Sequence, residues 1–183
     1  MRVALANTNR LIRIVNDILD MSKIEAGEMT AALKRTPLGP IIEDSVGTVE
    51  GFARSAGVTI TRPAGDLGEV TADHGRSIQV LVNLLSNAIK HAPAGSQIEV
   101  SAQREGAMMA IAVRDHGPGI PARKVAFIFE PFTQLDGSDR RRIAGTGLGL
   151  TIARALAEKQ GGAIRVASRE GDGATFTLTL PIA

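Results

Sequence analysis

The sequence predicts a two-layer α/β sandwich of the α+β class, preceded by an N-terminal amphipathic helix. Its strands come in pairs that turn back on themselves, around Glu105-Gly106 and around Gly171-Asp172-Gly173. Hydrophobic residues make up 44% of the 183 positions, which is enough for a substantial core, and Trp and Tyr are absent. Helices combined with this many hairpins indicate a two-layer mixed fold and not a doubly wound parallel sheet.

The first helix is predicted over residues 7–26, and Gly27 suits its C-cap. Its apolar residues recur at alternating spacings of three and four, which makes a nearly heptad-like stripe. They are Leu11, Ile14, Val15, Ile18, Met21 and Ile24. The helix either docks on its own domain or is half of a helical hairpin whose other half is missing. We favour the hairpin, because the next segment looks like a new domain, and we divide the chain into 1–30 and 31–183.

Turn residues and hydrophobic periodicity predict the remaining elements. A connector over 33–40 leads into the sandwich, and a glycine- and charge-rich mobile loop is expected over 130–144. Helices are expected at 41–56, 75–92 and 146–160, and strands at 58–61, 69–72, 97–104, 108–114, 163–168 and 174–180.

Charge and composition exclude several classes of function. Lys plus Arg number 21 against 19 for Asp plus Glu, and aromatic residues make up 3% of the chain. So small a surplus of basic residues, with so few rings for stacking, argues against a nucleic acid as partner. The chain has no cysteine for disulfide or thiolate chemistry, and no apolar run of about 18 residues that could span a membrane. We expect a cytoplasmic chain without membrane contact of its own, whose full-length parent can be membrane-anchored.

Four polar residues of the predicted helix 75–92 gather on one side of it: Asn83, Asn87, Lys90 and His91. Asparagine is a poor helix former, so each of the two weakens the helix by roughly a few tenths of a kcal/mol. A lone asparagine would indicate only a solvated face. Two asparagines followed by Lys-His favour a ligand, because amide oxygens suit Mg²⁺ that arrives with phosphates and keeps its waters.

A second motif, Asp115-His116-Gly117-Pro118-Gly119, follows a predicted strand. Its glycines let the backbone turn tightly and approach a ligand closely. The carboxylate can accept a hydrogen bond from an exocyclic amine such as that of adenine, worth about 1.5–3 kcal/mol. A simple Asp turn is the alternative for this motif taken alone.

A third motif, Gly-Thr-Gly-Leu-Gly-Leu at 145–150, opens the predicted helix 146–160. Backbone amides at a helix N-terminus form an anion site, and glycines keep side chains out of the way. The chain has no Gly-Lys-Ser/Thr, and Leu150 stands where a dinucleotide fingerprint has its third glycine, so two familiar phosphate loops are excluded. Arg140, Arg141 and Arg142 precede this motif. A solvated face is the default for such a charge run, and one or two of these arginines are candidate phosphate contacts.

With these motifs in this order, the chain resembles the ATP-binding region of a sensor histidine kinase of two-component signalling, over nearly its whole length. The motifs that match are the N box at 83–91, a glycine box at 115–119, the F box at 129–132, a second glycine box at 145–149 and a closing glycine–threonine motif at 171–176. Residues 10–27 resemble the second helix of the dimerisation hairpin. The resemblance implies a Bergerat-type ATP-binding fold, with ATP and Mg²⁺ as ligands.

The resemblance also implies a role for each matching position. Asn83 and Asn87 would hold Mg²⁺, Asn87 directly, and together with Lys90 they would form the catalytic set. Lys90 and His91 would reach phosphates, and Arg141 falls where many members have a lid arginine. The expected contacts to the rest of the nucleotide are Asp115 on the adenine amine, Gly117, Gly119 and Ile120 lining the base, Thr146, Gly147, Leu148 and Gly149 in the phosphate cradle, and Thr175 beneath the adenine through water.

Two departures from related proteins bear on the reaction. Relatives that hydrolyse ATP place a glutamate where Asn83 stands, and an amide cannot take a proton from water, so phosphoryl transfer to a protein acceptor fits better. None of the three histidines, His74, His91 and His116, matches the family's acceptor helix. We therefore expect either a fragment or truncated product, or a chain that acts on a histidine supplied by another chain.

The expected partners are ATP, a phosphoacceptor histidine helix and a response-regulator receiver domain, and a homodimer is an open alternative. Two other functions share the same pocket. One is a non-catalytic ATP-binding pseudokinase or interaction module, which the missing acceptor favours. The other is an anti-sigma-type serine protein kinase, which lacks a dimerisation hairpin and is therefore disfavoured by the helix at 7–26.

Overall fold

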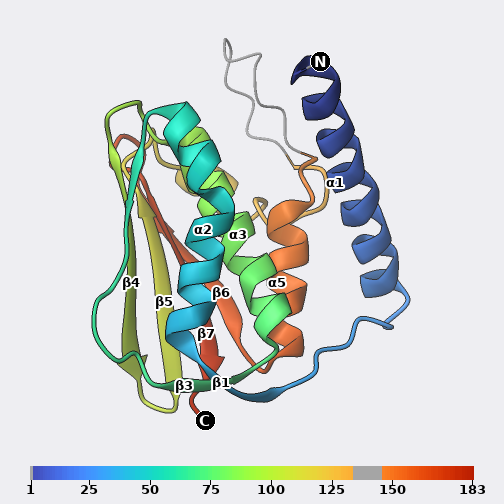
Figure 1. Ribbon diagram of the computed structural model, residues 1–183, viewed down its shortest axis with the longest axis vertical. Helices are drawn as coiled ribbons and strands as arrows, with labels where there is room; N and C mark the ends of the chain where they lie inside the picture. The colour runs from blue at the N-terminus through green and yellow to red at the C-terminus, as the bar shows by residue number, and fades with distance from the viewer. Residues whose placement is uncertain (1, 134–145) are drawn as a thin grey trace.

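The computed structural model describes residues 2–133 and 146–183. Its helices are α1 (Arg2–Glu25), α2 (Leu38–Ala56), α3 (His74–His91), α4 (Ala122–Val125) and α5 (Gly149–Lys159). Its strands are β1 (Lys34–Pro37), β2 (Thr59–Thr61), β3 (Glu69–Ala72), β4 (Gln97–Glu105), β5 (Met108–Asp115), β6 (Ala163–Ser168) and β7 (Ala174–Pro181). Figure 1 shows α2, α3 and α5 in front of the sheet, with α1 to one side.

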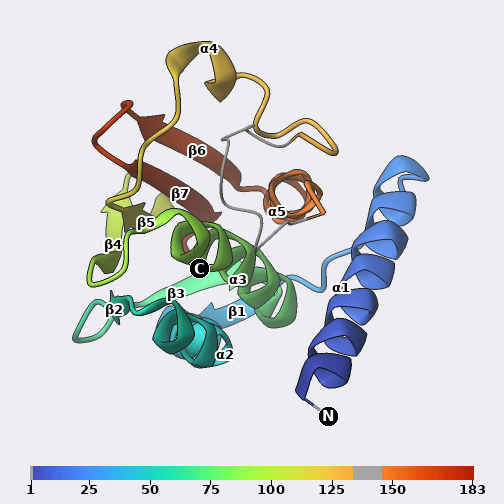
Figure 2. The same ribbon diagram turned by 90° about the horizontal axis from the view of Figure 1, so that it is seen from above.

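The described residues form a five-stranded sheet with the order β2-β4-β5-β7-β6, and β1 pairs separately with β3. In the larger sheet β2 runs parallel to β4, and the other neighbouring strands are antiparallel. Figure 2 shows α2, α3 and α5 together on one face of this sheet. The prediction of a two-layer α+β sandwich is therefore confirmed. The hairpin turns explain it, because antiparallel neighbours need only a short connection.

The core lies between the sheet and the helix layer. Ile111 and Val113 of β5 stand opposite Leu178 and Phe176 of β7, and all four are at most 1% exposed. From the helix layer, α3 adds the buried residues Val80, Leu81, Leu84, Leu85, Ala88 and Ile89. These residues recur three and four positions apart, so they turn one stripe of α3 toward the sheet and leave the other side to polar residues.

A buried amide ties α3 to α5. Gln160 follows α5 and is fully buried, and its Oε1 accepts hydrogen bonds from the Asp73 N–H and the Ser77 hydroxyl at 2.9 Å each. Asp73 caps α3 by accepting a hydrogen bond from the Arg76 N–H at 3.0 Å. Breaking this cluster would leave buried donors without partners, so it fixes the position of one helix against the other.

Several element boundaries differ from the predicted ones. β1 lies inside the predicted connector 33–40, where Thr36 pairs with Val70 of β3. This pairing joins residues far apart in the sequence, so local periodicity cannot indicate it. The helix predicted from residue 146 begins at Gly149, because Gly147 adopts a φ of +74° that no helix residue has. The short α4 is an additional helix, and the predicted mobile loop 130–144 lies outside the described residues from position 134 onward.

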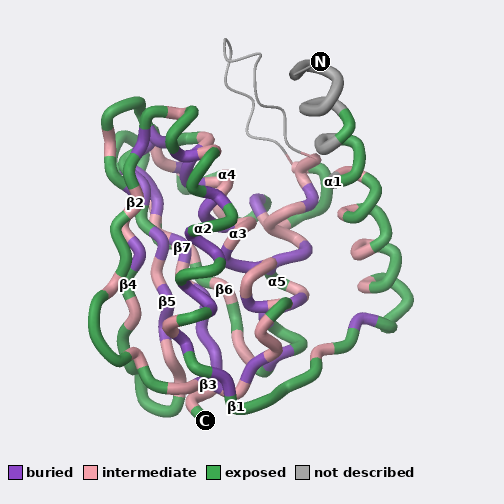
Figure 3. Tube along the Cα trace, in the orientation of Figure 1, coloured by how far each residue is buried: buried purple, intermediate pink, exposed green. Residues whose placement is uncertain are grey.

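α1 stands outside the two layers, and most of its described side chains are exposed (Figure 3). Ile14 is half-buried, whereas the other five large apolar residues between 11 and 19 are 47–62% exposed; they are Leu11, Ile12, Val15, Ile18 and Leu19. Nearer its C-terminal end, Met21 and Ile24 pack partly against the core. Within the described ranges, no helix is both long enough and apolar enough to cross a bilayer.

The segment after α1 already belongs to the packing of the sandwich. Met29 is 2% exposed and lies in the hydrophobic core. The Ala32 N–H donates a hydrogen bond to Asp73 Oδ2 at 2.8 Å. Core packing therefore begins before residue 31, where the sequence places the start of the second domain. The division into two domains itself stays a prediction.

Candidate functional site

The first contact between the predicted motifs joins α3 to the start of α5. Asn83 Nδ2 donates a hydrogen bond to the Gly149 carbonyl oxygen at 3.1 Å. A Cβ built on Gly149 would lie 3.6 Å from the Asn83 amide, so the two residues are in van der Waals range. Because the bond uses the amide nitrogen, the amide oxygen of Asn83 is the atom that can face a cation.

The other polar residues of the N box continue along α3 toward its C-terminal end. Asn83, Asn87 and Lys90 are half-buried. His91 is the last residue of the helix and is exposed. Protein atoms packed around the His91 ring lower its pKa, and the positive charge of Lys90 adds to this effect, whereas Asp115 opposes it. The cluster of polar residues that the sequence predicts on one side of α3 therefore ends beside the second motif, residues 115–119.

Asp115 is a buried carboxyl at the end of β5, with 3% of its surface exposed. Its Oδ1 accepts a hydrogen bond from the Gly117 N–H at 2.8 Å. Burial raises the pKa of Asp115, and the Gly117 N–H and the nearby His91 oppose that rise. A Cβ on Gly117 would lie 2.7 Å from the His91 carbonyl oxygen, so only glycine lets this turn touch the end of α3.

The turn after Asp115 is fastened to the hairpin between β6 and β7. Gly119 has a φ of +71°, and a Cβ there would lie 2.0 Å from the Arg169 carbonyl oxygen. The Ile120 N–H donates to Ser168 Oγ at 2.8 Å, and the Ser168 hydroxyl donates to the Gly173 carbonyl oxygen at 2.6 Å. Ile120, a predicted base contact, is buried at 7% exposure. Ser168 is a supporting residue that no sequence pattern indicated.

The glycine-rich entry to α5 is shaped by its contact with the F box. The Phe132 N–H donates to the Gly147 carbonyl oxygen at 3.1 Å, and a Cβ on Gly147 would lie 2.8 Å from the Phe132 Cα. Thr146 Oγ1 accepts a hydrogen bond from the Leu148 N–H at 3.2 Å. Leu148 is 1% exposed and anchors the segment in the core. Gly145 and the arginines at 140–142, including the predicted contact Arg141, lie outside the described residues.

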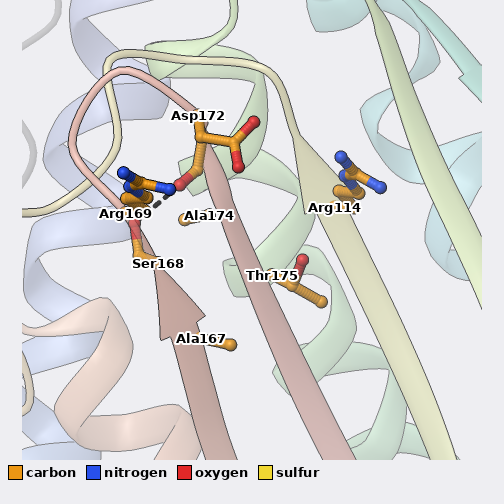
Figure 4. Close-up of a pocket in the computed structure, with 8 residues that line it drawn as sticks. Arg114, Ala167, Ser168, Arg169, Asp172, Ala174 and Thr175 are labelled. Carbon is orange, nitrogen blue, oxygen red and sulfur yellow. Dashed lines mark hydrogen bonds between the residues drawn. The ribbon is translucent and has the colours of Figure 1, made fainter.

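The structure does not bring Thr175 to Asp115. Ala174 is the residue paired with Asp115 across β5 and β7, whereas Thr175 pairs with Arg114. Successive strand residues point to opposite faces, so Thr175 lies on the outer face of the sheet, away from the helix layer. Figure 4 shows it there with Arg114 and Ala167. These residues line a depression of about 340 Å³. The residue next to the buried carboxyl is therefore Ala174, which the sequence reasoning missed.

Known proteins resemble this chain in sequence and in fold. A family model described as histidine kinase-, DNA gyrase B- and HSP90-like ATPase matches residues 72–183. An uncharacterized sensor-like histidine kinase of Rhizobium meliloti is 39% identical over 172 residues, which is 93% of this chain and 33% of that protein. The chain thus spans about a third of the length of this relative.

Solved structures of histidine kinases share the whole fold, α1 included. Full-length ShkA in complex with AMPPNP superposes on 99% of this chain with a TM-score of 0.79 and 29% identity, over 38% of its own length. The histidine kinase ThkA in complex with the response regulator protein TrrA also covers 99% of this chain, with a TM-score of 0.75 and 27% identity, over 50% of its own length.

Proposed function

Because the chain belongs to the family of histidine kinase-, DNA gyrase B- and HSP90-like ATPases, we propose that it binds Mg·ATP and transfers the γ-phosphate to a histidine. The observation that carries this proposal is the meeting of three motifs along α3. Asn83 contacts Gly149 at the entry to α5, and the His91 carbonyl lies against Gly117 beside Asp115. In this proposal, one helix would link the phosphate end and the base end of a single site.

Asp115 would select the base. It is buried, and the glycines of the turn that follows it let the backbone pack closely against the end of α3 and the β6–β7 hairpin. A buried carboxylate accepts a strong, charge-assisted hydrogen bond from an exocyclic amine, which adenine has at its 6-position. Gly117, Gly119 and Ile120 would then line the base. We do not include Thr175 in this site, because its side chain lies on the opposite face of the sheet.

Asn83 and Asn87 would hold Mg²⁺ through their amide oxygens, Asn87 directly. Two neutral hard oxygens fit a cation that arrives with phosphate ligands and retains its waters. When bound, Mg²⁺ would neutralise charge on the phosphates. Lys90 and the amides at the start of α5 would hold phosphate oxygens and orient the terminal phosphate, so that positioning and charge stabilisation supply the catalysis.

The acceptor histidine would come from outside this chain. His74 begins α3, His91 ends it, and His116 lies in the turn after β5, so none of the three is on α1. An amide at position 83 cannot deprotonate water, whereas a histidine acceptor brings its own nucleophile. Residues 1–30 would supply the second helix of a dimerisation hairpin and 31–183 the catalytic domain. ThkA in complex with the response regulator TrrA supports a receiver domain as the later partner.

A non-catalytic nucleotide-binding module is the second candidate, and the placement of the histidines favours it. It would share the base and phosphate contacts but transfer nothing. An anti-sigma-type serine kinase has less support, because α1 is shared with solved histidine kinases that cover 99% of this chain.

The test is transfer to an added acceptor. The chain is incubated with Mg²⁺, ATP labelled on the γ-phosphate, and a separately expressed acceptor hairpin from a sensor histidine kinase. Acid-labile, alkali-stable label on the hairpin supports the proposal, and Asn87→Ala should abolish that label. Binding of ATP without transfer to any histidine would favour the binding module, and acid-stable label on a serine acceptor would favour the serine kinase.

A further inference from the structure

A chain of hydrogen bonds runs from the glycine-rich entry of α5 to α1. The Leu148 N–H donates to Thr146 Oγ1 at 3.2 Å, and the Thr146 hydroxyl donates to Asp17 Oδ2 at 2.8 Å. Asp17 lies in the middle of α1, 129 positions earlier in the sequence than Thr146. A carboxylate from the N-terminal helix is thus bonded to the segment that would cradle phosphates.

This arrangement engages donors that a phosphate would need. A threonine hydroxyl has a single hydrogen, so Thr146 can donate it to Asp17 or to a phosphate oxygen, but not fully to both. The Leu148 amide is likewise directed at Thr146 Oγ1. Two donors of the cradle, the Thr146 hydroxyl and the Leu148 N–H, are therefore engaged within the chain while α1 is docked.

α1 is held at a second point that leaves the cradle untouched. Asp20 Oδ2 accepts a hydrogen bond from Gln79 Nε2 at 2.6 Å, and Asp20 Oδ1 lies 3.8 Å from Arg76 Nη1. Both partners are on α3, near its N-terminal end. Five of the six large apolar residues of α1 from Leu11 to Leu19 stay exposed, so these polar bonds add to the packing of Met21 and Ile24 in holding the helix. A competitor for one of those bonds can therefore loosen the helix.

We propose that Asp17 competes with the phosphates of the nucleotide for Thr146, so that docking of α1 and binding of ATP oppose each other. This inference rests on the proposed function. The coupling is reciprocal: docked α1 weakens ATP binding by the same factor by which ATP weakens the docking of α1. Repulsion between the Asp17 carboxylate and a triphosphate at the same hydroxyl acts in the same direction. ATP binding would thus release α1 from the domain, and the apolar stripe of α1 would then contact no other part of the chain.

The experiment compares Asp17→Ala with a matched control in the full chain. Glu25→Ala removes the same charge from an exposed position of the same helix. Calorimetric titration with ATP and Mg²⁺ should give a dissociation constant at least about fivefold lower for Asp17→Ala than for the wild type. Glu25→Ala should match the wild type. In the wild type, ATP should also speed amide hydrogen exchange in α1.

The outcomes separate this inference from the function on which it rests. An affinity of Asp17→Ala equal to or weaker than that of the wild type, with binding otherwise intact, would overturn the competition alone. Absence of saturable binding in all three proteins would overturn the proposed function and the competition with it. Tighter binding by Asp17→Ala, together with faster exchange in wild-type α1 when ATP is added, is the result that supports the competition.

Discussion

The backbone carbonyl oxygen of His91 lies 2.7 Å from the position that a Cβ on Gly117 would occupy. His91 ends α3, and Gly117 belongs to the turn after β5, so this contact places the end of one motif against the start of another. On the same helix, Asn83 is bonded to Gly149 at 3.1 Å. The candidate site is therefore built on close approaches of backbone at glycines, and its geometry depends on their lack of a side chain.

Gly117→Ala should weaken ATP binding and lower stability together. The added methyl group would have to displace the His91 carbonyl or Asp115 Oδ1, which lies 2.8 Å from the same position. Overpacking of this kind costs about 1–3 kcal/mol. Gly47→Ala is the control, because Gly47 is an exposed residue of α2 with no atom within 4 Å of its Cβ position. It should gain about 0.5–1 kcal/mol. Thermal unfolding that does not distinguish the two variants would contradict the contact.

Asp115 should make stability depend on pH in a defined direction. Burial in the folded chain raises its pKa above its ordinary value of 3.8. The folded chain therefore keeps this proton to a higher pH than the unfolded chain does, and ionisation lowers stability as pH rises from 3.8 to the folded value. Asp115→Asn lacks this loss. The Tm of Asp115→Asn relative to the wild type should rise across that window and then stay constant, measured without nucleotide. A difference that does not vary with pH would argue against the shifted carboxyl.

Asn83 and Asn87 should differ in how their substitution affects ATP binding. Asn83→Asp replaces the Nδ2 donor by an oxygen that faces the Gly149 carbonyl, so it should weaken binding both with Mg²⁺ and in the presence of a chelator. Asn87→Ala should weaken only the binding measured with Mg²⁺, because its expected role is that of a cation ligand. Paired calorimetric titrations measure both quantities. If Asn87→Ala lost the same affinity for ATP with Mg²⁺ as in the presence of the chelator, the metal role of Asn87 would be ruled out.

A fragment that lacks α1 should be more stable when it keeps the residues just before position 31. Met29 is 2% exposed in the core, so residues 28–183 should be more stable than residues 31–183. The expected difference is about 1.5–3 kcal/mol, the contribution of a fully buried methionine side chain. Urea unfolding of the two fragments measures it. In the full chain, Met29→Ala should reproduce the loss, and Leu33→Ala, at a 45% exposed position, should cost much less. Fragments of equal stability would show that Met29 contributes little.

The sequence predicted those parts of the molecule that repeat a local pattern. The stripe Leu81, Leu85, Ala88 set the buried side of α3, and the side chains of Asn83 and Asn87 followed from it on the other side. The role of the turn glycines could also be predicted from the local sequence, because few other residues fit a tight turn or adopt a positive φ. Motif order placed the polar residues of α3 near the glycine turn, and the contact of His91 with Gly117 agrees with that.

Other features depend on contacts between distant segments, which a single sequence does not show. The pairing of β1 with β3 and the hydrogen bond between Asp17 and Thr146 are of this kind. Thr175 is a different case. It directly precedes Phe176, a core residue, so strand alternation alone already indicated that its side chain points away from the site. The resemblance to a glycine–threonine motif outweighed that signal, and the register of β7 decides against it.

The central claim is that Asp115 holds the base of a bound ATP, and a calorimetric titration of ATP with Mg²⁺ into the wild type and Asp115→Asn tests it most directly. The wild type should bind saturably, and the variant should bind at least about tenfold more weakly, as expected for loss of a charge-assisted hydrogen bond. Circular dichroism should show the same fold for both. Wild-type affinity in Asp115→Asn, or no binding by the wild type at millimolar ATP, would contradict the claim.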